Sequence, residues 1–263
     1  MPPDAAQPKD ATRVSVVEQV AEQIAFGIAS GVYPAGTRLP SVRNLAVEHG
    51  INPSTVQVVL GRLQSAGFVD SHQGLGVLVR DVRLLGGIET WRYLFRFSQQ
   101  LPDLAVRMLE DILATRATLV ATAVRTIAKD PGKFDSTGVR RAVEQLELLI
   151  AANPNDWDHV AQAELHAVRM VIAIAGQGLA LAVFNSVGEM LLEVPDVVRT
   201  MYRDPQLHVV FWKAFLTAWE SGELNEGRIS AVEDVIHQRD TETAKRFRSR
   251  LTRGRTPRSP ARR

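Results

Sequence analysis

The sequence contains no cysteine. This absence excludes disulfides, thiolate nucleophiles and cysteine metal ligands, and it is typical of proteins from a reducing compartment. No apolar run approaches the ~18 residues that a membrane-spanning helix requires. The first residues, MPPDAAQPKDATR, contain no apolar segment of the signal-peptide type. We therefore expect a soluble, cytoplasmic protein with no membrane partner.

Signatures of catalysis are also scarce. The 6 histidines do not form a spaced pair of the metal-site type. The sequence has neither a G-x-S-x-G motif nor a glycine-rich phosphate loop. We therefore expect no enzyme activity, no catalytic residues and no cofactor.

The charge is unevenly distributed along the chain. The formal net charge is only +2 over 263 residues. Residues 81–242 are acidic overall, whereas no acid follows Glu242 and many arginines do. The last residues, 253–263, are expected to form a basic disordered tail. Such a tail either touches phosphate non-specifically or only keeps the chain in solution.

The first 80 residues carry signals for three helices and a hairpin. An apolar stripe that includes Val20, Ile24 and Ile28 predicts a first helix ending at Gly31. The turn YPAGTRLPS ends in Ser41, which is expected to cap a second helix over 42–49. The stretch FVDSHQGLGVLV reads as a small β-hairpin. With a third helix from residue 53, this predicts a winged helix-turn-helix over 12–80, after a flexible segment 1–11.

The third helix, in INPSTVQVVLGRL, has a polar front and an apolar back. Asn52 suits the N-cap, and Pro53 suits the first helical position, where its missing N–H costs nothing. Helical spacing gathers the apolar side chains on one face: Val56, Val59, Leu60 and Leu63. The polar residues of the first turns lie on the other side: Ser54, Thr55 and Gln57.

The second half of the chain has helical periodicity throughout. The glycine pair in DVRLLGGIE indicates a linker over 81–88. Proline and glycine breaks then divide residues 89–252 into six or seven helices, an all-α bundle. The fold class is therefore mainly α, with a winged helix-turn-helix at the N-terminus and a helical bundle after it.

The run SGVYPAGTRLPSVRNLAVEHGINPSTVQVVLGRLQSAGFVDSHQGLGVLV resembles the GntR-type winged helix of bacterial transcription factors. The matching positions are the PAG-x-x-LPS turn, the Leu-Ala of the second helix, the ST-V of the third and the G-x-G of the wing. The resemblance implies a homodimer that places helix 53–66 in the major groove of operator DNA and the wing tip in the adjacent minor groove. It also implies a DNA contact set: Arg43, Asn52, Ser54, Thr55, Gln57, Gln73 and Gly74.

The chemistry of these side chains suits that role. An arginine reaches phosphate or guanine, a helix N-terminus holds phosphate, and glutamine pairs with adenine. Members with fatty-acid-type operators usually have arginines at the positions of Pro53 and Gln57. We therefore do not expect the usual operator of those members.

The helical domain resembles that of the FadR subfamily, and ILATRATLVATAVRTIAKDP looks like its fatty-acyl-responsive members. Many members of the subfamily hold a divalent metal. Matching AIAGQ to the family pattern places Leu165, Arg169, Lys213 and His237 at the ligand positions. Since leucine, arginine and lysine are not ordinary metal ligands, we expect no metal. The fatty-acyl-responsive members are metal-free as well.

Arg116 lies on the apolar face of its helix, between Ile112 and Leu119. A buried cation must be paired, so Arg116 either holds a carboxylate of another helix or faces a pocket for an anionic ligand. With Arg169, Trp212 and Lys213 it forms the predicted ligand site. Such a set suits a fatty acyl-CoA or a related lipid-like acid. Alternatively, Arg169 and Lys213 reach solvent.

Together these features predict a ligand-responsive DNA-binding regulator. One alternative is a sensor of another organic acid. A second is a constitutive DNA-binding dimer whose bundle is only a dimerisation scaffold.

Overall fold

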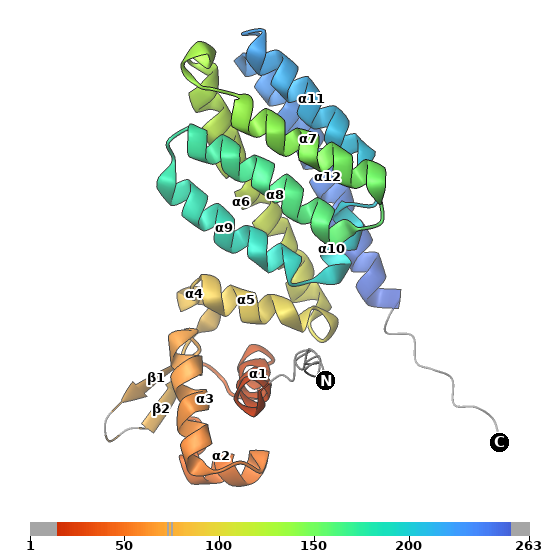
Figure 1. The fold of residues 1–263 in the computed structure, drawn as a ribbon. Coiled ribbons are helices and arrows are strands. Elements are labelled where there is room, and N and C mark those ends of the chain that lie inside the picture. Colours follow the sequence, from red (N-terminus) through yellow and green to blue (C-terminus); the bar gives the residue numbers. More distant parts are fainter. Residues whose placement is uncertain (1–14, 73, 75, 254–263) are drawn as a thin grey trace, which may run out of the picture. The chain divides into compact units, whose positions relative to one another are not determined.

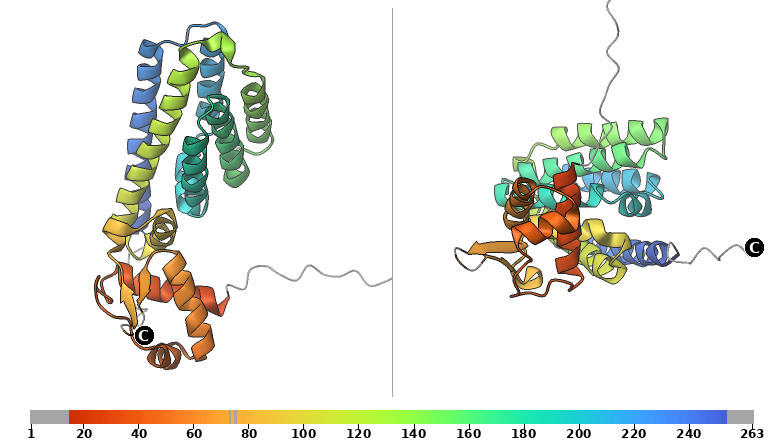
Figure 2. Two further views of the ribbon diagram at one scale, coloured as in Figure 1. Left: turned by 90° about the vertical axis from the view of Figure 1, so that its left-hand side faces the viewer. Right: turned by 90° about the horizontal axis from the view of Figure 1, so that it is seen from below.

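The computed structural model describes residues 15–72, 74 and 76–253. The predicted N-terminal segment 1–11, the wing residue Gln73 and the tail beyond Arg253 lie outside the described residues. The chain divides into two compact units, with the boundary between Leu94 and Phe95. Figures 1 and 2 show the elements of each unit.

The first unit contains three helices and a two-stranded antiparallel sheet. The helices are α1 (Val16–Ala29), α2 (Val42–His49) and α3 (Pro53–Ser65), and the strands are β1 (Val69–His72) and β2 (Gly76–Val79). The strands pair from Val69 opposite Val79 to His72 opposite Gly76, and Arg38 forms a bridge to Leu78. The core includes Ile24, Leu45, Leu63 and Phe68, all almost fully buried. The predicted winged helix-turn-helix is confirmed.

The caps explain where these helices begin and end. The Ser41 hydroxyl accepts the Asn44 N–H at 3.2 Å, and Asn52 caps α3 as the sequence predicts. Gly31, which follows α1, has φ +85°. A side chain rarely adopts this left-handed conformation, so glycine is favoured there.

Residues 81–88, predicted as a linker, contain helix α4 (Val82–Leu85), and α5 (Ile88–Arg96) begins at their end. The Thr90 side chain is fully buried and donates to the Ala66 carbonyl at 2.6 Å. A Cβ on Gly86 would lie 2.3 Å from the Val82 carbonyl oxygen, so Gly86 permits a close approach. Glycine is therefore required at this position for packing, and it does not indicate a flexible linker.

Tyr93 also attaches α5 to the winged helix. Its hydroxyl accepts from the Arg62 Nε at 2.7 Å, and its ring packs edge-on against Phe68 at 5.6 Å. Arg62 also forms an ion pair with Glu18 of α1. These contacts extend the first compact unit to Leu94, beyond the segment from which the linker was predicted.

The second unit is a helical bundle of seven α-helices among the described residues from Phe95 onward, besides the end of α5. They are α6 (Pro102–Ala128), α7 (Thr137–Ala152), α8 (Trp157–Ile174), α9 (Gly178–Leu192), α10 (Pro195–Met201), α11 (Gln206–Glu220) and α12 (Glu226–Arg253). The short 3₁₀ turns Phe97–Gln99 and Pro131–Lys133 flank α6. The predicted all-α bundle of six or seven helices is confirmed.

The two longest helices, α6 and α12, run side by side (Figures 1 and 2). The core packs between α6, α7, α8, α9 and α11, with Leu146, Ile172 and Phe184 almost fully buried. Within the described residues no single helix is long and apolar enough to cross a membrane. Helices α9 and α10 reach that length and composition only as a pair, and they meet at a bend of 100°.

Replacing Thr90 by valine tests whether α5 belongs to the first unit. The change keeps the shape of the side chain but leaves the Ala66 carbonyl without its buried donor, which costs about 1–3 kcal/mol. We expect faster hydrogen exchange across residues 16–94, measured by mass spectrometry. Thr118→Val, which removes an exposed hydroxyl bonded within α6, is the matched control. Unchanged protection of residues 16–94 in Thr90→Val would contradict this account.

Candidate nucleic-acid interface and buried cavity

The start of α3 is organised by one side-chain oxygen. The Asn52 Oδ1 accepts the Thr55 N–H at 2.7 Å, the Ser54 hydroxyl at 2.7 Å and the Thr55 hydroxyl at 2.8 Å. The Ser54 N–H lies in the first turn, where backbone donors have no partner within the helix. A phosphate placed there meets a free N–H and the positive end of the helix dipole, next to the Ser54 and Thr55 hydroxyls that Asn52 holds.

The exposed side of α3 has a stripe of small and uncharged side chains along its middle. Ser54, Gln57, Val58 and Gly61 are exposed and follow helical spacing, while the opposite side is buried in the core. Nothing lies within 4 Å of where a Cβ on Gly61 would be. The stripe is therefore low and open, as a helix that enters a DNA groove requires.

Two further predicted contacts lie on neighbouring elements. Arg43 is exposed in the first turn of α2. Gly74 occupies the turn between β1 and β2 with φ +78°, in open space. Of the predicted contact set, only Gln73 lies outside the described residues.

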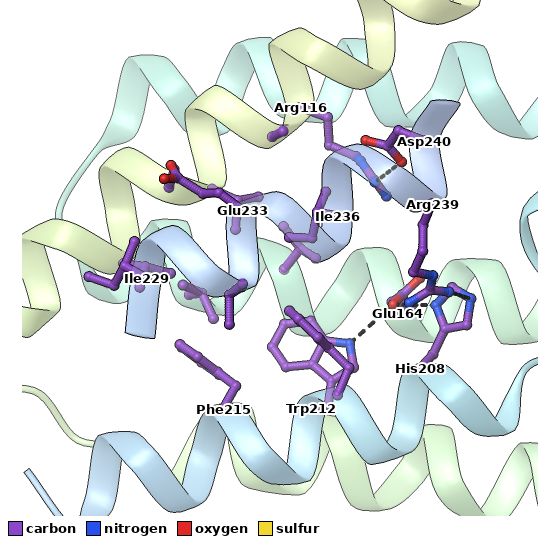
Figure 3. Close-up of a pocket in the computed structure, with 18 of the residues that line it drawn as sticks. Arg116, Glu164, His208, Trp212, Phe215, Ile229, Glu233, Ile236, Arg239 and Asp240 are labelled. Carbon is purple, nitrogen blue, oxygen red and sulfur yellow. Dashed lines mark hydrogen bonds and ion pairs between the residues drawn. The ribbon is translucent and has the colours of Figure 1, made fainter. Parts of the chain in front are cut away.

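A cavity of about 120 Å³ lies inside the bundle (Figure 3). Its walls come mainly from α6, α8, α11 and α12 and are mostly apolar: Val120, Val168, Phe211, Phe215, Ile229 and Ile236. One side carries charged and polar groups from the same helices: Arg116, Glu164, His208, Trp212, Arg239 and Asp240. The cavity therefore has an apolar body and a polar side.

Glu164 of α8 is the centre of that polar side. Its Oε2 accepts the Tyr202 hydroxyl at 2.6 Å, and its Oε1 accepts His208 Nδ1 at 2.7 Å and Trp212 Nε1 at 3.2 Å. Burial by itself raises the pKa of Glu164, but the His208, Tyr202 and Arg116 interactions outweigh it. They hold the pKa far below its ordinary value, so the carboxylate stays ionised.

His208 connects Glu164 to α12. Its Nε2 lies 2.6 Å from the Arg239 Nη2. An arginine can only donate, so Nε2 accepts in this contact, while Nδ1 donates to Glu164. Nε2 also lies 3.3 Å from the Met201 carbonyl oxygen. The His208 ring stacks on Tyr202 with centroids 4.8 Å apart.

Arg116 and Asp240 form the second polar contact of the cavity. The Arg116 Nη2 lies 3.0 Å from the Asp240 Oδ1, and the two side chains are only 17% and 16% exposed. Burial raises the pKa of Asp240, and Arg116 opposes that rise. The sequence left two alternatives for Arg116: an ion pair with a carboxylate of another helix, or a pocket for an anionic ligand. The structure contains the ion pair, with Asp240 of α12, and this pair lines the cavity (Figure 3).

Only one of the other predicted ligand residues lines the cavity. Trp212 lines the cavity. Arg169 instead donates to the Asn185 Oδ1 at 2.7 Å, and Lys213 pairs with Glu147 at 2.6 Å. The Lys213 side chain is 56% exposed, so it does not point inward. Helical geometry explains this. Successive side chains point about 100° apart around the helix axis, so the residue after an inward-pointing one faces another direction.

Sequence reasoning missed Glu164, His208 and Asp240. A usable signal existed for the first two. Glu164 has Val160 and Val168 at −4 and +4, so it lies on the apolar face of α8. His208 precedes Trp212 and other aromatic residues of α11 at helical spacing. This is the same pattern that singled out Arg116.

No cluster of three or more histidine, aspartate or glutamate side chains is placed to hold a metal ion in the described part of the chain. His237, the one histidine among the predicted ligand positions, lies on α12.

Comparison with known proteins identifies the first unit. Residues 16–79 match the family described as "Bacterial regulatory proteins, gntR family". The chain is 40% identical to the HTH-type transcriptional regulator Mce2R of Mycobacterium tuberculosis over 106 residues, which are 40% of this chain and 42% of that protein. It is 38% identical to the HTH-type regulator Rv0494 of the same species over 169 residues, 64% of this chain and 61% of that protein. The matches thus span about half the length of these relatives.

Two other likenesses extend over most of the chain. The "Fatty acid metabolism regulator protein" of Haemophilus influenzae is 24% identical over 233 residues, 88% of this chain and 90% of that protein. The solved structure of Lar, described as controlling the expression of the Listeria monocytogenes agr system, has a TM-score of 0.53 at 15% identity. It covers 90% of this chain and 98% of its own. The second likeness concerns the fold alone.

Replacing Glu164 by glutamine tests the buried carboxylate. The change removes the charge that faces Arg116 and Arg239, and the loss of one partner in a buried charge cluster costs roughly 3 kcal/mol. A depressed pKa also means that the unfolded chain takes up the proton first as the pH falls. The stabilisation by Glu164 is therefore complete above the ordinary glutamate pKa of about 4.3 and is lost below it.

We expect Glu164→Gln to unfold at lower urea than the wild type at about pH 6, with the difference shrinking towards about pH 3. Circular dichroism follows the unfolding. Glu147→Gln removes a half-exposed carboxylate on the same bundle and serves as the control. Equal urea midpoints for the two variants at both pH values would overturn the role of Glu164.

Proposed function

We propose that this chain, whose N-terminal domain is a GntR-family winged helix-turn-helix, is a homodimeric transcriptional regulator. It binds operator DNA through α3 and the wing, and a small anionic ligand in the bundle cavity controls its affinity for DNA. The observation that carries the proposal is the presence of an exposed α3 stripe in one unit and, in the other, of a mostly apolar cavity whose polar side includes the Arg116 and Arg239 guanidinium groups among carboxylates.

The contacts at the start of α3 support DNA binding. The Asn52 side chain holds Ser54 and Thr55 in place before DNA arrives, so little side-chain freedom is lost on binding. Gln57 is exposed one turn further along, where its amide can pair with an adenine edge. Arg43 adds a cation for phosphate or guanine. We assign phosphate contacts to Ser54 and Thr55, and base reading to Gln57.

The cavity supports control by an amphiphilic acid. Its apolar walls suit a hydrocarbon chain, and the Arg116 guanidinium suits a carboxylate or phosphate. An entering anion competes with Asp240 for Arg116. Burial raises the pKa of Asp240, so this carboxyl can take up a proton when an anion replaces it beside Arg116. We therefore place the acidic group of the ligand beside Arg116 and Trp212, and we withdraw Arg169 and Lys213 from the site.

The size of the cavity suggests how the signal is transmitted. At about 120 Å³ it is smaller than the ~300–1,000 Å³ of typical ligand pockets, so a long chain enters only if helices separate. Because α6 and α12 both line the cavity, separation moves the two longest helices of the bundle. A ligand that binds the opened state shifts the population towards it and thereby alters the affinity for DNA.

A fatty acyl-CoA or a related lipid-like acid is the ligand class that we favour. The likeness to a protein named as a fatty acid metabolism regulator supports this choice. Pro53 and Gln57, in place of the arginines of such regulators, make a different operator the expected target. Another organic acid remains the alternative ligand.

A constitutive DNA-binding dimer with a bundle that serves only as a scaffold is the second candidate. One observation favours it: Arg116 already has a carboxylate partner within the chain, so the bundle needs no ligand to neutralise it. The two candidates differ in whether any small molecule changes the affinity for DNA.

The first experiment measures DNA binding by fluorescence anisotropy. The labelled DNA comes from the upstream region of the gene for this chain, and the salt concentration is fixed. We expect Gln57→Ala to weaken binding by about 1–3 kcal/mol, because it removes a base contact. Gln162→Ala, an exposed glutamine of α8, is the control and should bind as the wild type does. Equal binding by all three proteins would exclude base reading by Gln57.

The second experiment adds palmitoyl-CoA, below its micellar concentration, to the bound DNA. We expect release of DNA from the wild type but not from Arg116→Gln/Asp240→Asn. This double variant removes both charges of the cavity pair and leaves no unpaired buried ion. Lys213→Gln/Glu147→Gln removes a surface pair instead and should respond as the wild type does. If DNA stays bound with palmitoyl-CoA and with shorter organic acids, the scaffold candidate holds.

A further inference from the structure

A second hollow in the bundle lies on its surface, at the carboxyl end of α12. It measures about 740 Å³ and is lined by α10, α12 and the first residue of α8, Trp157. This volume is within the range of sites that bind nucleotide-sized molecules. Unlike the buried cavity, its lining is dominated by charged side chains.

Six cationic side chains line this hollow, which we call the basic groove: Arg199, Arg203, Lys245, Arg246, Arg250 and Arg253. Glu242 is the one carboxylate among the described lining residues. Like charges gathered in a concave surface repel one another, and the low-dielectric walls strengthen the field inside it. The entry of an anion into the groove therefore lowers the free energy.

Neighbouring acids neutralise only part of this charge. Arg246 pairs with Glu242 at 2.8 Å, and Arg250 lies 3.6 Å from Asp196. For Arg203 and Lys245 no acidic partner occurs among the described residues, and both are exposed.

Arg199 is held in place without an acid. Its guanidinium carbon lies 5.8 Å from the centre of the Trp157 ring, a cation–π contact that leaves its charge unneutralised. A positioned guanidinium loses little freedom when it binds an anion and offers the planar donor fork that fits phosphate oxygens.

From this geometry we propose that the basic groove binds the phosphate groups of a polyphosphorylated small molecule, of the size of a nucleoside diphosphate. Arg199 of α10, Arg203 of the segment that follows α10, and Lys245 of α12 hold the phosphates. The concave shape favours a small molecule over a DNA duplex or a lipid surface, because neither fits into a hollow of about 740 Å³. The proposal is independent of whether the apolar cavity binds a ligand.

The test titrates inorganic tripolyphosphate and ADP into the full chain by isothermal titration calorimetry, at about 50 mM and about 200 mM salt. We expect saturable binding of one molecule per chain, weaker at the higher salt. Arg203→Gln/Lys245→Gln should weaken it by about tenfold or more, because charge-assisted bonds are lost. Neither residue has an ion-pair partner among the described residues, so the fold should tolerate the change.

Arg107→Gln/Lys129→Gln is the matched control, because it removes two exposed cations elsewhere in the bundle. It should change the affinity less than about twofold if the groove is the site. Equal weakening by the two double variants would overturn the proposal in favour of diffuse electrostatics. The absence of saturable binding would also overturn it. A third outcome would overturn it as well: tripolyphosphate and ADP both fail to bind, while phosphatidylserine vesicles or non-operator DNA bind and lose affinity in the groove variant.

Discussion

The buried carboxylate of Glu164 is the interaction on which the bundle depends. It accepts hydrogen bonds from Tyr202 at the end of α10 and from His208 and Trp212 of α11. His208 in turn accepts from Arg239 of α12. An ionised group inside an apolar core requires partners that donate hydrogen bonds to it, so Glu164 ties together elements of four helices. The same requirement places polar groups on one side of a cavity that is otherwise apolar.

The two units hold their polar side chains in different ways. In the winged helix the Asn52 oxygen holds Ser54 and Thr55 in an exposed, pre-ordered arrangement. In the bundle the charges at the cavity neutralise one another, and Arg116 is available to an anion only when Asp240 gives way. For the function that we propose, pre-organisation suits the DNA-binding surface, whereas a ligand-controlled switch requires two states of similar free energy.

The basic groove and the cavity show how one helix can serve two kinds of chemistry. On α12, Ile229 and Ile236 face the apolar cavity, whereas Lys245 and Arg246 line the groove. The change follows the sequence, because no acidic residue occurs after Glu242. The first part of the helix is a core element, and the last turns form a cationic surface.

The sequence by itself determined the local elements: the caps at Ser41 and Asn52, the α3 faces, the hairpin and the helical character of the bundle. These depend on interactions within a few residues, which spacing and residue type reveal. Only the tertiary structure decided which charges meet. Arg116 finds Asp240 across 124 positions and Glu164 finds His208 across 44, while Arg169 and Lys213 turn elsewhere. It also decided that α5 packs on the winged helix, where the Thr90 hydroxyl donates to the Ala66 carbonyl. Such pairings depend on how helices pack and rotate against one another, and a single sequence contains no direct record of that rotation.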